Sequence, residues 1–195
     1  RMDTQHEPDE HLDEAFPAPS PLSPLSLASL AWRQPSVMER RYELNYNFGN
    51  LGWLAFTSAW RETAEAEIGM QGWKFDRVGF FRRKVLIWHK GEAEPFATYQ
   101  PHTWRPGGWL ELPDGASYEL NSNFWSSRFE LRTADERLLL TFHKSGWFRT
   151  SVEIEVDPTA ARLIELPLLV AFGMYAILLH QHDSAAAGAV VATSS

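Results

Sequence analysis

The feature that most constrains the fold is an apolar segment near the end of the chain. Residues 163–179 (LIELPLLVAFGMYAILL) contain a single charged side chain, Glu165. A helix that is apolar on all sides is either enclosed by protein or placed in a bilayer. The segment is shorter than the roughly 20 residues that a bilayer core requires, and no basic cluster follows it. We therefore expect a helix over about residues 160–182 that is buried inside the protein, with a membrane-inserted helix as the alternative.

The residues before this segment alternate between large and polar side chains with a period of two. The alternation is clearest in residues 42–46, 64–68 and 152–156. It is typical of antiparallel strands with one buried and one solvated face. Clusters of Gly, Pro and Asp separate further candidate strands. We expect these strands near residues 53–60, 72–78, 84–89, 94–100, 107–112, 116–122, 127–133 and 137–144.

Short stretches of the chain also repeat. YELNYNF at residues 42–48 returns as YELNSNF at residues 118–124, and aromatic strand patterns return at spacings of 43 and 44 residues. We interpret these similarities as three repeated β units, over about residues 41–70, 72–112 and 116–156.

The number of strands and the apolar segment predict one architecture. A closed barrel of ten or more strands is too wide for side chains alone to fill, since about eight strands already reach that limit. A helix is about 10–12 Å across and fills such a space. The sequence therefore predicts a mainly β fold: an antiparallel closed β-barrel of about 11–12 strands around a buried C-terminal helix.

Composition and charge set the expected domain limits. The chain has a net charge of −7, and most of the acidic excess and six of its 12 prolines lie in residues 1–36. We expect a flexible tail there, the barrel domain over residues 37–183, and an Ala-rich flexible tail over residues 184–195. The leucines of residues 22–32 leave open that this part of the tail docks on the barrel.

Residues 71–90 form the one strongly basic stretch, with six basic side chains against Asp76. An anionic partner is expected to bind there. The candidate lipid headgroup-binding residues are Lys74, Arg77, Arg82, Arg83 and Lys84. The alternative is a solvated strand whose charges offset nearby glutamates.

Three tryptophans lie at or beside predicted loops, where an amphipathic ring suits a membrane interface. These candidates for membrane-interface contact are Trp104, Trp109 and Trp147. Packing at the barrel ends is the alternative reading.

The sequence gives little support to catalysis, metal binding or nucleic-acid binding. The chain has no cysteine, and it contains no G-x-S-x-G, P-loop, H-E-x-x-H or dinucleotide-binding glycine pattern. His180 and His182 face apart on a helix, which argues against a metal site. An acidic chain with one basic stretch is a poor candidate for nucleic-acid binding. We expect no enzymatic activity, no cofactor, no metal and no nucleic-acid partner.

The predicted barrel around a final helix resembles the Tubby C-terminal-like superfamily, and within it the phospholipid scramblases and the plant LURP-one-related proteins. The resemblance covers about residues 40–182. It rests on the repeated YELN(Y/S)NF, on the run Gly79-Phe80-Phe81-Arg82-Arg83, and on Glu165-Leu166-Pro167 leading into residues 168–179.

The resemblance implies peripheral binding of anionic phospholipid headgroups by basic side chains on the barrel, here in residues 74–84. The calcium site reported for scramblases is not carried over, because the acidic residues 153–165 lack the dense oxygen-ligand spacing of a calcium loop. We expect a cytoplasmic, non-enzymatic binding module that associates with the membrane surface. The alternatives are a soluble adaptor that binds a protein partner through its N-terminal tail, and a membrane-anchored scramblase-like protein.

Overall fold

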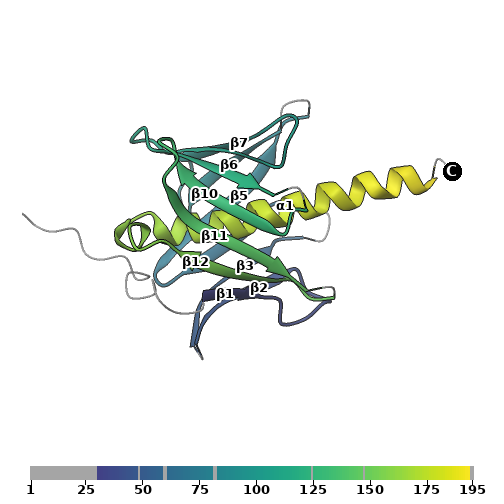
Figure 1. Cartoon of the computed structure of the whole chain (residues 1–195), viewed down its shortest axis with the longest axis horizontal. Helices are drawn as coiled ribbons and strands as arrows, with labels where there is room; N and C mark the ends of the chain where they lie inside the picture. The colour runs from purple at the N-terminus through teal and green to yellow at the C-terminus, as the bar shows by residue number, and fades with distance from the viewer. Residues whose placement is uncertain are drawn as a thin grey trace, which may run out of the picture.

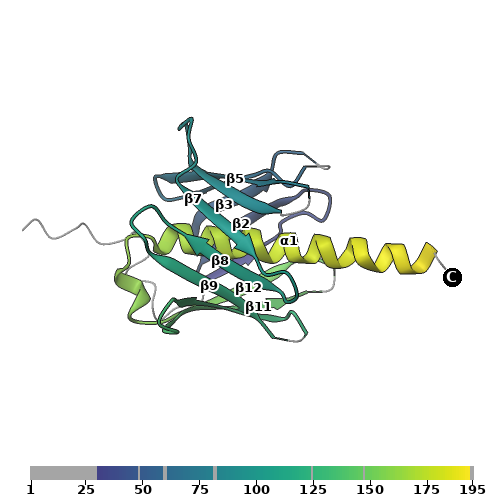
Figure 2. The same cartoon turned by 90° about the horizontal axis from the view of Figure 1, so that it is seen from above.

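The computed structural model describes residues 30–47, 49–58, 61–80, 83–123, 125–146 and 148–193, with the backbone alone for residues 188–193. Twelve antiparallel strands form a closed barrel around one long helix (Figures 1 and 2), which confirms the predicted fold. The strands are β1 (Leu30–Arg33), β2 (Arg41–Tyr46), β3 (Gly49–Phe56), β4 (Ala64–Ile68), β5 (Gln71–Val78), β6 (Lys84–His89), β7 (Ala97–Pro101), β8 (Gly107–Glu111), β9 (Ser117–Ser122), β10 (Arg128–Thr133), β11 (Leu138–Ser145) and β12 (Ser151–Val156). A 3-10 turn, η2 (Ala160–Arg162), precedes helix α1 (Leu166–Thr193).

Strand β1 closes the barrel by pairing with both β2 and β12. Leu30 lies opposite Tyr46 on one side and Ile154 on the other, and Trp32 is fully buried. Residues 30–33 therefore belong to the barrel, and the predicted domain start at residue 37 is too late. The four residues of β1 follow a Pro- and Ser-rich stretch, which hid them in the composition. Residues 1–29 of the predicted tail lie outside the described residues.

Helix α1 passes through the barrel and projects from one end (Figures 1 and 2). All of its large side chains up to Leu179 are buried, as are the inward-facing side chains of the strands. Two of the three inward residues of β4 are Ala64 and Ala66, whose small side chains let the helix pack close to that strand. The predicted burial of the apolar segment is thus confirmed. Within the described part of the chain, no helix is long and apolar enough to cross a membrane.

The helix starts later and ends later than predicted. Residues 160–165 form the η2 turn and its connection to the helix, and α1 then continues through residues 184–193, where we expected a flexible tail. Alanine has the highest helix propensity, and residues 184–193 contain no proline to stop the helix.

The two ends of the barrel carry alternate connections. The proximal end contains the start of α1 and the connections β2–β3, β4–β5, β6–β7, β8–β9 and β10–β11. The distal end, from which α1 projects, contains the connections β1–β2, β3–β4, β5–β6, β7–β8, β9–β10 and β11–β12. Since consecutive connections fall on opposite ends, residues close in sequence are often at opposite ends of the barrel.

One glycine of α1 sets the distance between the helix and the wall. A Cβ atom on Gly173 would lie 2.2 Å from Cζ of Phe142, a fully buried side chain of β11. The ring of Phe142 therefore packs directly against the helix backbone. No other residue type fits there without moving the ring.

We expect Gly173→Ala to lower the free energy of unfolding by about 1–3 kcal/mol, because it overpacks the core. A loss of stability would identify the overpacking, because the same substitution in an exposed helix has the opposite effect. Alanine is the better helix former and stabilises an exposed helix by about 1 kcal/mol relative to glycine. Chemical denaturation of the single variants and of Gly173→Ala combined with Phe142→Leu measures the effect. The two substitutions together are expected to cost less than their sum, and an alanine variant as stable as the natural chain would contradict this packing.

Candidate functional site

Exposed apolar side chains gather at the distal end of the barrel. Trp104 is 94% exposed and Phe148 is 86% exposed, each in the middle of a distal connection. Five of the six distal connections present such side chains among the described residues, and the sixth, β3–β4, is described only in part. The full set comprises Val37, Met38, Phe80, Trp104, Trp125 and Phe148. At the proximal end the described residues add two, Met70 and Ile164.

The described connections also differ in charge between the two ends. The described distal connections contain five arginines and two glutamates, which gives a net charge of +3. The arginines are Arg40, Arg61, Arg83, Arg105 and Arg149, and the glutamates are Glu39 and Glu62. At the proximal end seven carboxylates stand against three basic side chains, a net charge of −4; these are Glu92, Glu94, Asp114, Asp135, Glu136, Asp157 and Glu165 against Lys90, Arg137 and Arg162. The barrel is therefore electrically polar along its axis, with the exposed aromatic rings at its positive end.

The projecting part of α1 lies at the same positive end. From Ser184 to the end of α1 at Thr193 the helix contains no charged residue, and residues 184–187 are exposed. The distal end thus combines aromatic side chains, basic side chains and an uncharged helical projection.

A partly buried ion pair holds the helix against the wall at this end. Nη1 and Nη2 of Arg77 donate to the two carboxylate oxygens of Asp183, both at 2.9 Å, and Nη1 also donates to Glu62 at 3.1 Å. The side chain of Arg77 is only 9% exposed. Burial lowers the pKa of this guanidinium, but the two carboxylates outweigh it and raise the pKa overall. Arg77 therefore serves as an anchor between β5 and α1, with its donors directed inward.

The structure does not bring the five predicted headgroup residues into one patch. Lys74 lies on the outer wall of β5, with its ammonium 5.0 Å from the ring centre of Trp88, whereas Arg77 faces the interior. Arg83 is exposed at the distal end, with Nη1 3.7 Å from Asp183. Lys84 is exposed at the start of β6, and Arg82 lies outside the described residues.

The three predicted interfacial tryptophans are also separated. Trp104 occupies the β7–β8 connection at the distal end. Trp109 is half-buried on the outer wall within β8, opposite Gln100 and Glu119. Trp147 lies outside the described residues. Of the candidates, Trp104, Arg83 and Lys84 share the distal end.

The sequence interpretation missed most of the exposed distal side chains. A signal for them was present: aromatic pairs occur at residues 80–81, 124–125 and 147–148, each between two predicted strands. The sequence interpretation used the first two pairs to align the repeats and the first also for the family resemblance, and of the third pair it named Trp147 alone as an interfacial candidate. Two adjacent aromatic residues in a turn are not needed for a strand core, which makes them candidates for a contact surface.

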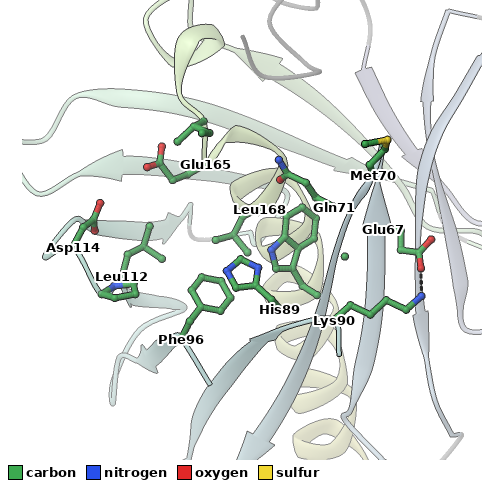
Figure 3. A pocket seen from close by; sticks show the side chains of 15 residues that line it. Glu67, Met70, Gln71, His89, Lys90, Phe96, Leu112, Asp114, Glu165 and Leu168 are labelled. Carbon is green, nitrogen blue, oxygen red and sulfur yellow. Dashed lines mark hydrogen bonds and ion pairs between the residues drawn. The ribbon is translucent and has the colours of Figure 1, made fainter. Parts of the chain in front are cut away.

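A cavity of about 880 Å³ opens at the proximal end, beside the start of α1 (Figure 3). Trp73 and Leu168 form part of its apolar wall, and Glu67 forms an ion pair with Lys90 at its edge (Figure 3). Neither the cavity nor its lining was predicted from the sequence, because the lining comes from turns far apart in the chain. Among the described residues no group of three His, Asp or Glu side chains is placed to hold a metal ion.

Comparison of the chain with protein-family models, with curated proteins and with solved structures found no match. No family is therefore assigned. The resemblance to the Tubby C-terminal-like superfamily stays a prediction that rests on the sequence pattern.

The ion pair of Arg77 gives a direct test of how α1 is held. We expect Arg77→Lys to lower the free energy of unfolding by about 1–2 kcal/mol, since lysine keeps the charge but cannot form the two parallel hydrogen bonds to Asp183. Arg83→Lys is the matched control, because its guanidinium is exposed and 3.7 Å from the same carboxylate. Thermal unfolding checks both variants. Equal stability of the two variants would contradict the anchoring role.

Proposed function

We propose that the protein binds anionic membrane surfaces peripherally, through the distal end of its barrel. The observation that carries the proposal is the set of exposed apolar side chains on five of the six distal connections, interleaved with basic residues. A membrane interface favours this combination, since amphipathic rings partition to the headgroup level and each basic side chain near an anionic surface contributes about 1 kcal/mol.

The polarity of the barrel supports an end-on orientation. An anionic surface attracts the distal connections and repels the acidic proximal connections, so the barrel axis is expected to stand upright on the membrane. The projecting helix then points into the bilayer. Most of its backbone hydrogen bonds are made within the helix, and the carbonyl groups of its last turn can accept hydrogen bonds from water at the headgroup level, so an uncharged helical end suits the interface.

The proposal differs from the sequence prediction in the surface that it uses. The prediction placed binding along residues 74–84 of the barrel wall. Within that stretch, Arg83 and Lys84 lie at the distal end and belong to the proposed surface. Lys74 lies on the outer wall and Arg77 is occupied by its carboxylate partners, so neither takes part.

The aromatic part of the proposal is tested by paired substitutions at the distal end. We expect Trp104→Ser combined with Phe148→Ser to reduce co-flotation of the full chain with phosphatidylcholine–phosphatidylserine vesicles at least tenfold, because two interfacial anchors are lost. Met70→Ser combined with Ile164→Ser removes exposed apolar side chains from the proximal end and is the matched control. If only the control variant lost binding, the membrane contact would lie at the proximal end, which would contradict the proposal.

The electrostatic part is tested by neutralising arginines at one end at a time. We expect Arg83→Gln combined with Arg149→Gln to weaken binding to anionic vesicles and to flatten its salt dependence, since fewer charges face the lipid. Arg137→Gln combined with Arg162→Gln makes the same chemical change at the proximal end and is expected to leave binding unchanged or slightly stronger. If the natural chain binds neither neutral nor anionic vesicles, the membrane proposal is wrong, and the distal side chains serve a protein contact.

A further inference from the structure

The proximal cavity has the dimensions and the walls of a small-molecule site. Ligand pockets typically measure about 300–1,000 Å³ and are lined mostly by apolar and aromatic side chains with a few polar groups. The cavity measures about 880 Å³. It lies at the opposite end of the barrel from the proposed membrane surface, so the inference drawn from it is independent of that proposal.

Aromatic and aliphatic side chains form the inner wall of the cavity. Trp73 and Leu168 are buried and line its base. At the side, the imidazole of His89 stacks on Phe96 with ring centres 3.9 Å apart. Figure 3 shows His89, Phe96 and Leu112 around the cavity together with Leu168 of α1. Such walls bind an apolar body, and the faces of aromatic rings also attract cations.

The charged groups around the cavity leave a negative excess. Lys90 is the single lysine or arginine among the described lining residues, and Glu67 neutralises it by forming an ion pair. Two lining carboxylates then have no cationic partner among the described residues. Asp114 accepts one hydrogen bond from the backbone N–H of Ala116, at 2.9 Å. Glu165 forms no hydrogen bond or ion pair with any other described side chain, and its carboxylate lies on the same side of the cavity as Asp114 (Figure 3).

The negative charges of these two carboxylates also affect a neighbouring tyrosine, Tyr118. The pKa of Tyr118 is raised to about 12, first by burial and then by the charges of Glu165 and Asp114. The charges of both carboxylates therefore act on the hydroxyl group of the same tyrosine, next to the cavity. Among the residues that the structure describes, no basic side chain offsets them at this tyrosine.

We propose that the cavity binds an organic cation with an apolar body, that is, an amphiphilic ammonium compound. The ammonium group lies between Asp114 and Glu165, and the apolar body packs against Trp73 and Leu168. The negative charges of Asp114 and Glu165 favour a cationic ligand. A fatty acid or a phosphate ester would place a negative charge beside two carboxylates.

Isothermal titration calorimetry of the full chain with octyltrimethylammonium tests the proposal. Octanoate and octanol share the alkyl chain and serve as the anionic and neutral probes. We expect the cation to bind and the anion not to bind. Glu165→Gln and Asp114→Asn are each expected to weaken binding of the cation about three- to tenfold, and the double variant more than either.

Two further variants separate the site from general surface charge. Asp135→Asn removes a carboxylate from another turn of the proximal end that does not line the cavity, and it is expected to leave the affinity unchanged. Ile164→Ser removes an apolar side chain from the lining and is expected to weaken octanol and the cation alike. The proposal is overturned if octanoate binds as tightly as the cation, if no probe binds, or if Glu165→Gln and Asp135→Asn have the same effect. Thermal unfolding of each variant confirms that it is folded.

Discussion

The structure depends on one constraint: a closed barrel of twelve strands is too wide to be filled by its own side chains. Helix α1 fills it, which is why the helix is apolar on every side and why Gly173 must admit the ring of Phe142. The helix in turn requires the wall, since its apolar surface has no other cover. Strand β1 completes this enclosure by joining β2 to β12. The barrel and the helix therefore stabilise one another.

This arrangement also determines where function can lie. The interior is taken up by the core, and the outer wall carries polar side chains and half-buried tryptophans in local pairs, such as Arg41 on Trp53 and Lys74 on Trp88. The distinctive chemistry is found at the two ends. One end is basic and aromatic and carries the projecting helix, and the other is acidic and contains a cavity. A protein built in this way can contact a surface with one end while the other end stays accessible to a small ligand.

The sequence was sufficient to predict the fold because both of its signals extend over many residues. Period-two alternation marked most of the strands, and the burial of residues 163–179 followed from their lack of charge. Strand β1 was missed because four residues in a Pro- and Ser-rich context carry too little pattern. The repeat at 76 residues was also misleading. Its copies, β2 and β9, run in opposite directions along the barrel. The weaker repeats at 44 and 43 residues relate β6 to β10 and β7 to β11, and the strands of each of these pairs are four strands apart and run the same way.

The candidate sites were less predictable, because they depend on which turns meet at one end. Arg77 looked like part of a basic patch, yet its partner Asp183 is 106 positions away. The charge difference between the ends follows from assigning alternate turns to opposite ends, a step that the predicted strands already allowed. The cavity required the three-dimensional arrangement, since Trp73, Asp114 and Glu165 come from separate parts of the chain.

End-on membrane binding is tested by paramagnetic relaxation enhancement of the backbone amides of the natural chain, measured by NMR on anionic nanodiscs with nitroxide-labelled lipid headgroups. End-on binding predicts strong enhancement at the distal connections, around Met38, Trp104, Trp125 and Phe148, and along the projecting helix. It predicts none at the proximal turns that contain Asp114 and Asp135. Enhancement centred on the barrel wall at Lys74, or on the proximal turns, would contradict it.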